Sequence, residues 1–171
     1  MKKCKSENCN NNVFSKGLCK FHQPKKQVKK LDFNTKDLDS LPNSDLKKIA
    51  DYELRQYLLR TTYNINGNYF CPLKKKWYSS NKIQVCHYID RGYSMWTRYL
   101  LKNCHLMSEE ANCWDSKIMV EGFKSKHHKD YQKYLISTYG ENIINELVET
   151  SKNKNIFSKQ EYINIINDFR K

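Results

Sequence analysis

The first 23 residues contain little material for a hydrophobic core, and this limits what they can fold into. Their apolar filling consists of Val13, Phe14, Leu18 and Phe21. A segment this small needs a stabilising cross-link, such as a bound metal ion, in place of a core. Cys4, Cys9, Cys19 and His22 stand at the spacing C-x4-C-x9-C-x2-H. Three thiolates and one imidazole satisfy tetrahedral Zn²⁺, whose binding would supply folding free energy. The spacing therefore predicts a structural zinc module over residues 1–23.

The charge of the chain points to polyanionic partners. Lys and Arg number 31 against 18 Asp and Glu, giving a formal charge of +13 over 171 residues. Such a field favours nucleic acid or an acidic membrane surface. No apolar run approaches the ~20 residues of a spanning helix, and the N-terminus shows no signal-peptide core. We therefore expect a cytoplasmic protein whose seven cysteines are thiols or metal ligands, not disulfides.

Hydrophobic periodicity predicts an α+β protein with three parts. These are the zinc module, a basic and then acidic linker over residues 24–42, and a main domain over residues 43–171. Asn43 or Ser44 is the expected N-cap of the first helix, and the capping box Ser158-x-x-Glu161 opens the last. The expected elements are a helix over 43–63, short strands over 64–89, and helices over 108–123, 128–140, 141–151 and 158–171.

A candidate catalytic group lies in the middle of this domain, in the segment VCHYIDRG. Histidine titrates near neutrality and is the natural general base for activating a water. His87 follows a strand-like stretch, Asn103 follows 16 residues later, and Asn112 begins an expected helix. This order is that of a ββα-metal (HNH) finger: a base on a strand, an orienting amide on the loop, and a metal ligand on the helix. The spacing alone also fits a histidine packed in a hairpin.

Longer segments resemble the NinG/Rap recombination endonucleases of phages. The similarity runs from about residue 43 to residue 171, about three quarters of the chain. It rests on the order and spacing of several motifs together. The N-terminal segment, in turn, resembles small zinc modules attached to many phage nucleases and DNA-binding proteins. The segments that carry the main resemblance are LRQYLLR, GNYFCPL, CHYIDRG, TRYLLKNCHLMSEEAN, YQKYLISTYGENIINELVE and SKQEYINIINDFRK.

The resemblance implies a DNA endonuclease that depends on Mg²⁺ or Mn²⁺ and acts on branched DNA or single-strand/duplex junctions in recombination. His87 takes the place of the general base, Asn103 of the orienting residue and Asn112 of the helix ligand. His105 matches a family histidine that serves packing or phosphate contact. Arg91 and Arg98 match basic residues suited to phosphate. Separately, Lys74, Lys75 and Lys76 lie between aromatic residues, a pattern suited to DNA contact on a hairpin.

The sequence departs from the family at its zinc and metal ligands. The family's two cysteine pairs correspond here to Cys71 with Lys74, and to Ser108 with Ala111, so we expect its zinc to be absent and the core to replace it. Cys86 precedes the base where many HNH fingers have a metal-binding Asp, and a thiolate is a poor ligand for Mg²⁺. Asp90 and Asp115 are alternative oxygen ligands. A rearranged zinc site is another alternative to simple core thiols, and it would combine Cys71 with Cys86, Cys104 or Cys113.

Two functions of other classes remain open at this point. A catalytically degenerate DNA-binding protein would keep the fold and the charge, and the missing ligands favour it. A zinc-module protein that bridges recombination partners would lose its DNA affinity with the basic linker. The oligomeric state has no signature in the sequence.

Overall fold

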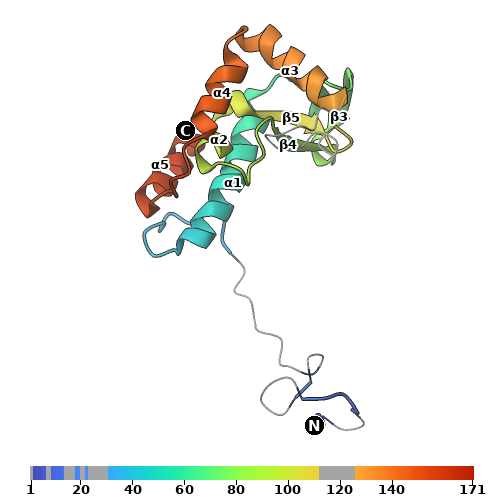
Figure 1. The fold of residues 1–171 in the computed structure, drawn as a ribbon, viewed down its shortest axis with the longest axis vertical. Coiled ribbons are helices and arrows are strands. Elements are labelled where there is room, and N and C mark those ends of the chain that lie inside the picture. The colour runs from blue at the N-terminus through green and yellow to red at the C-terminus, as the bar shows by residue number, and fades with distance from the viewer. Residues whose placement is uncertain (1, 7–8, 14–17, 20–21, 23–30, 112–125) are drawn as a thin grey trace. The chain divides into compact units, whose positions relative to one another are not determined.

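The computed structural model describes residues 2–6, 9–13, 18–19, 22, 31–111 and 126–171, and of residues 126–128 the backbone alone. The chain divides into two compact units, Met1–Asp32 and Phe33–Lys171. The second unit mixes helices with two small antiparallel sheets, which confirms the predicted α+β class (Figure 1). None of the helices in the described ranges is long and apolar enough to cross a membrane.

A pair of packed helices forms one end of the second unit. Helix α1 (Asn43–Thr61) buries Leu46, Ile49 and Leu54 on one face, as helical periodicity predicts. Helix α5 (Lys159–Arg170) packs along α1 and opens with the predicted capping box at Ser158. The N-cap of α1 is Pro42, where the sequence suggested Asn43 or Ser44, and its side chain makes no capping hydrogen bond.

Residues 33–42, predicted as part of a linker, instead pack against these two helices. Arg170 donates hydrogen bonds to the carbonyls of Phe33 and Thr35, at 2.8 and 2.9 Å. The ring of Phe33 lies 4.9 Å from that of Tyr52, and Leu38 is buried. The second unit therefore begins about ten residues earlier than the expected main domain.

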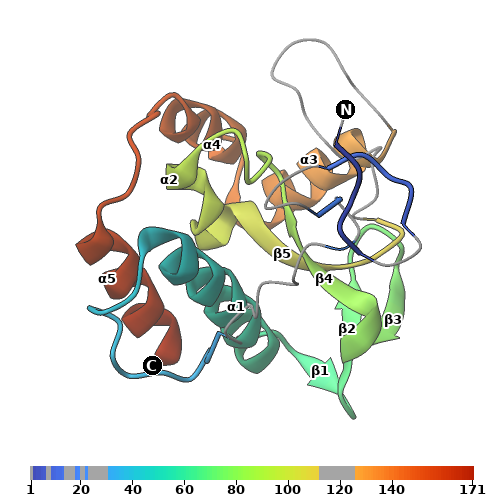
Figure 2. The same ribbon diagram turned by 90° about the horizontal axis from the view of Figure 1, so that it is seen from below.

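A three-stranded antiparallel sheet follows α1, in the order β1 (Asn64–Ile65), β2 (Asn68–Cys71) and β3 (Lys76–Ser79). The β1–β2 turn is Asn66-Gly67, and both residues have positive φ, as tight hairpins require. The hydroxyl of Tyr69 donates to the carbonyl of Leu59, which ties the sheet to α1. Figure 2 shows these strands on the opposite side of the unit from α4 and α5.

The second sheet carries the candidate catalytic segment. The short helix η1 (Ser80–Lys82) leads into β4 (Ile83–His87), which pairs antiparallel with β5 (Cys104–Ser108). The intervening loop contains α2 (Met95–Arg98) and η2 (Leu101–Asn103). Ser108, the expected start of a helix, is the last residue of β5, and a turn follows it. Most of that expected helix lies outside the described residues.

Two further helices complete the unit. Helix α3 (Lys126–Tyr139) ends at Gly140, whose φ of +94° is the left-handed conformation that stops a helix. Helix α4 (Ile143–Ser151) follows after a short turn and packs against α3 and α2. Both helices confirm the prediction from periodicity.

Candidate functional site

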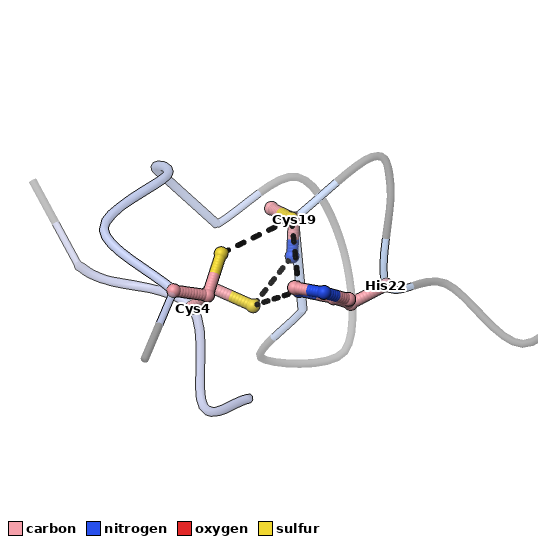
Figure 3. A group of neighbouring side chains, drawn as sticks. Cys4, Cys19 and His22 are labelled. Atoms are coloured by element: carbon pink, nitrogen blue, oxygen red, sulfur yellow. Dashed lines mark hydrogen bonds between the residues drawn. The ribbon is translucent and has the colours of Figure 1, made fainter. Parts of the chain in front are cut away.

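The four predicted metal ligands of the first unit come together. The sulfur and ring-nitrogen atoms of Cys4, Cys9, Cys19 and His22 all lie within 4.8 Å of one another. The Cys9 and Cys19 sulfurs are 3.7 Å apart, and His22 Nδ1 is 3.5 Å from the Cys4 sulfur and 3.4 Å from that of Cys19 (Figure 3). Tetrahedral zinc with ordinary bond lengths would place two sulfurs about 3.8 Å apart, and sulfur and nitrogen about 3.5 Å apart. The cluster can therefore hold a metal ion, with Nδ1 as the ligand atom of His22.

Local backbone hydrogen bonds build this cluster. Lys3 and Asn12 form an antiparallel bridge, and the Cys4 amide donates to the carbonyl of Asn11 at 2.9 Å. The amide of Cys9 closes a turn on Ser6. The amide of Cys19 donates to the Cys4 sulfur at 3.2 Å. Desolvation opposes it, but hydrogen bonds from the backbone of Ser6 and Cys19 hold the pKa of the Cys4 thiol below its ordinary value. The pKa of the Cys9 thiol is raised instead: a backbone hydrogen bond from Asn11 lowers it, but desolvation and the neighbouring Cys19 and Cys4 outweigh that bond.

His87 lies at the end of β4, with its ring held by the loop that follows. Its Nε2 is 3.0 Å from the carbonyl oxygen of Arg98. A carbonyl only accepts, so Nε2 carries the hydrogen and Nδ1 of the neutral ring keeps its lone pair. Nδ1 has no hydrogen-bond partner among the described residues. Because no buried side-chain nitrogen or oxygen there lacks a partner, this atom retains contact with solvent.

Desolvation dominates the electrostatics of this histidine. It lowers the pKa of His87 to about 4, against the opposing effect of the hydrogen bond to Arg98, and the charges of Arg98 and Arg91 lower it further. The imidazole is therefore neutral at physiological pH. Its Nδ1 can accept a proton, but a pKa of about 4 makes it a weaker base than a free imidazole.

Asn103 does not contact the His87 ring directly, contrary to the sequence-based expectation. Its side chain is fully buried and joins the two ends of the loop. Oδ1 accepts from the amide of Ile89 at 2.7 Å, and Nδ2 donates to the carbonyls of Ile89 and Thr97 at 3.0 and 2.9 Å. Thr97 directly precedes Arg98, whose carbonyl holds the histidine. Asn103 thus orients His87 through the backbone of the loop.

Arg98 is a structural residue, and its predicted role in phosphate binding is wrong. Its side chain is 7% exposed and forms a bidentate ion pair with Asp51 of α1, with Nε 2.8 Å from Oδ1. Its Nη1 donates to the carbonyl of Arg91 at 3.0 Å. All three nitrogens of this buried guanidinium donate to protein groups, whereas Arg91 itself is exposed.

His105 is also a packing residue. The hydroxyl of Tyr131 donates to the carbonyl of Cys86 and therefore accepts from His105 Nδ1, 2.9 Å away. Nε2 then accepts from the hydroxyl of Tyr139 at 3.0 Å. Burial lowers the pKa of His105 to about 4, so the ring stays neutral in this network. Of the two roles considered for this residue, the structure selects packing.

The structure describes only some of the residues that were expected to bind a catalytic metal. Asp90 accepts a hydrogen bond from the amide of Gly92 at 2.7 Å through Oδ1 and shapes the turn after β4. Cys86 is buried. Asn112 and Asp115 lie outside the described residues. Among the residues that the structure describes, the N-terminal cluster is the one group of three or more His, Cys, Asp or Glu side chains arranged for a metal.

The turns that follow β2 and β5 are closed by interactions between protein groups. Cys71, Ser108 and Ala111 are buried, and the amide of Ala111 bonds to both oxygens of Ser108. Lys74 of one turn and Glu110 of the other form an ion pair at 3.8 Å. Cys71, Cys86 and Cys104 are buried and belong to no group of three or more metal-binding side chains in the described ranges, and Cys113 lies outside them. This favours the interpretation as core thiols.

Three residues that shape this region differ in how far the sequence indicated their roles. Asp51 sits beside apolar positions of α1 and carries no pattern that marks it as the partner of Arg98. Tyr131 and Tyr139 lie on one side of the predicted helix 128–140, so their inward direction was visible, though not their bond to His105. Comparison of the chain with family models, curated proteins and solved structures gives no match.

Proposed function

We propose that this protein is a metal-dependent DNA endonuclease of the HNH type, acting on branched or junction DNA in phage recombination or replication. The observation that carries the proposal is the state of His87. Its Nε2 is tied to the Arg98 carbonyl, and its Nδ1 is unprotonated and in contact with solvent. The strand–loop–strand order of β4, the loop and β5 is the order that such a finger requires.

In this mechanism His87 Nδ1 takes a proton from the water that attacks the phosphorus atom. Asn103 is a positioning residue, because it fixes the loop that holds the imidazole. A Mg²⁺ or Mn²⁺ ion would lower the cost of charge on the leaving oxygen. Asn112 is the oxygen ligand implied by the resemblance, and Asp90 is a substitute candidate whose second carboxylate oxygen has no partner among the described residues.

The DNA backbone is held, in this proposal, by exposed basic side chains. Arg91 lies four residues after His87 and is exposed, as are Lys75 and Lys76 at the β2–β3 hairpin. Each contact with a phosphate releases counterions, so the affinity should fall steeply as salt is raised. We further propose that the N-terminal cluster holds a structural Zn²⁺, because thiolate and imidazole ligands with tetrahedral spacing suit that ion.

A second function is a DNA-binding protein that has lost catalysis. The observation in its favour is that the described residues around His87 provide no group of three metal-binding side chains. A thiol, Cys86, also stands where a carboxylate would help. The fold and the charge would then serve binding alone.

The test is cleavage of labelled duplex, flap and four-way-junction DNA with Mg²⁺ or Mn²⁺. We compare wild type, His87→Ala and Gln84→Ala, an exposed position on the same strand. Products that need the metal and disappear in His87→Ala alone, with DNA binding retained, support the nuclease. Equal cleavage by His87→Ala would refute the role of this residue. Binding without cleavage by any of the three proteins favours the second function.

A further inference from the structure

One face of the three-stranded sheet exposes large apolar side chains to solvent. Tyr63 is 74% exposed, Ile65 46%, Phe70 41% and Trp77 43%. Contiguous apolar patches of this kind on a protein surface mark binding sites more often than chance. We call Tyr63, Phe70 and Trp77 the aromatic platform.

The strand register places these residues together. Phe70 and Trp77 are directly paired across β2 and β3, so their side chains share a face. Ile65 pairs with Asn68, two residues before Phe70, and therefore lies on the same face. The ring centroids of Phe70 and Trp77 are 5.5 Å apart, and those of Tyr63 and Trp77 are 6.1 Å apart. The alternate residues Tyr69 and Cys71 are buried on the other face.

The segment of the chain that carries the platform has charged side chains of one sign. Residues 61–82 contain four lysines and no Asp or Glu. Lys74 and Lys75 lie in the turn between the two strands that carry Phe70 and Trp77, and Lys75 is exposed. Lys74 is paired with Glu110 at 3.8 Å. Exposed aromatic rings beside an exposed lysine match a ligand that has flat apolar groups and a negative backbone.

We propose that the aromatic platform binds single-stranded nucleic acid, with bases stacked on Trp77 and Phe70 and a phosphate held by Lys75 in the adjacent turn. In a duplex the bases are already stacked on one another, so only an unpaired strand offers its base faces to such rings. The inference deepens the proposed function by naming the unpaired arm of a junction as the part recognised. It uses no catalytic group and no metal.

The surface beyond Phe70 extends the space available to such a strand. Phe70 also lines a cavity of about 260 Å³, together with Tyr57, Tyr134 and Tyr139. The hydroxyl of Tyr139 lies in this lining and hydrogen-bonds to His105. A strand stacked on Phe70 therefore meets a recess lined by further aromatic rings and not a flat polar surface.

Fluorescence anisotropy with labelled oligothymidylate and with a duplex, without added Mg²⁺ or Mn²⁺, measures this binding apart from cleavage. Trp77→Ala removes one stacking surface, Trp77→Phe keeps an aromatic ring, and Tyr93→Ala removes an exposed ring elsewhere in the unit. We expect Trp77→Ala to weaken oligothymidylate binding roughly 5- to 150-fold, the loss expected for one stacked base. Trp77→Phe should retain most of the affinity, and Tyr93→Ala all of it.

A further variant tests the phosphate contact. Replacing Lys75 by Ala should reduce the dependence of log affinity on log salt by roughly 0.7, the contribution of one phosphate contact on a single strand. Wild-type affinity in Trp77→Ala, or duplex binding that loses as much as oligothymidylate binding, would overturn the proposal. The proposal would also be overturned if Trp77→Ala changed the self-association of the protein, measured by sedimentation, and left nucleic-acid binding unchanged. Binding that depends on the platform, without cleavage of any DNA, would refute the nuclease proposal and still support this inference.

Discussion

Replacing Asn103 by Ala should destabilise the second unit by about 3–5 kcal/mol, far more than an amide-to-alanine change at the surface. The side chain makes three hydrogen bonds, to the amide and carbonyl of Ile89 and to the carbonyl of Thr97. Each contributes about 1 kcal/mol net, and buried backbone groups left without partners add up to ~1–3 kcal/mol each where water cannot reach them. For a unit of this size, that change corresponds to a fall in Tm on the order of 10 °C.

The assay is thermal and urea unfolding of the full chain, with Asn164→Ala as the matched control. Asn164 is an exposed amide on α5 that accepts one hydrogen bond from Gln160. We expect less than about 0.5 kcal/mol from the control. If Asn103→Ala were as mild as Asn164→Ala, Asn103 would not hold the loop, and the indirect route from Asn103 to the His87 ring would fail with it.

Two further predictions concern metal and pH. The chain should bind one zinc ion, and the variant Cys19→Ser should not bind it. Removal of the zinc by a chelator should alter the NMR signals of residues 1–32 and leave those of the second unit unchanged. Undiminished zinc binding by Cys19→Ser would rule out the cluster as the site. The pKa values of His87 and His105 lie near 4 in the folded protein against an ordinary 6.5, so the unfolded chain binds more protons between these values. Stability should therefore fall as pH drops through that window, by roughly 2 kcal/mol per histidine at about pH 5. Urea midpoints measure this loss, which His105→Gln should reduce, and a flat profile down to pH 5 would contradict the buried neutral rings.

Local signals in the sequence were enough to predict most of the helices and the hairpin turn. The capping box at Ser158, the turn at Asn66-Gly67 and the stop at Gly140 each depend on a few neighbouring residues. The packing of residues 33–42 was not predicted, because it depends on Arg170 at the other end of the chain. A segment rich in Lys, Asp and Ser has the composition of a linker. That composition does not reveal whether a distant side chain binds the carbonyl groups of the segment.

The candidate sites show the same division between near and distant contacts. The N-terminal cluster was predicted in full, since its four ligands lie within 19 consecutive residues and few spacings suit a metal. The role of Arg98 was predicted wrongly, because its partner Asp51 is 47 residues away and on another element. A basic residue near a candidate base suggests phosphate binding until its own ion pair is known. The same holds for His105, whose two tyrosine partners come from a helix later in the chain.

The turns at Cys71 and Ser108 show how the second unit can hold two strand ends together without a metal. In this structure β2 lies beside β5, and the turns that follow these strands meet through Lys74 and Glu110. That ion pair is largely exposed at Glu110 and is worth at most about 1 kcal/mol, so it cannot be the main support. The buried side chains beneath it, and the hydrogen bonds that Ser108 makes to the amide of Ala111, are shielded from solvent and carry more of the stability. A cysteine pair and its zinc would be redundant in such a frame. An intact His87 loop therefore needs no metal at these turns, and the nuclease proposal is decided by the chemistry at His87.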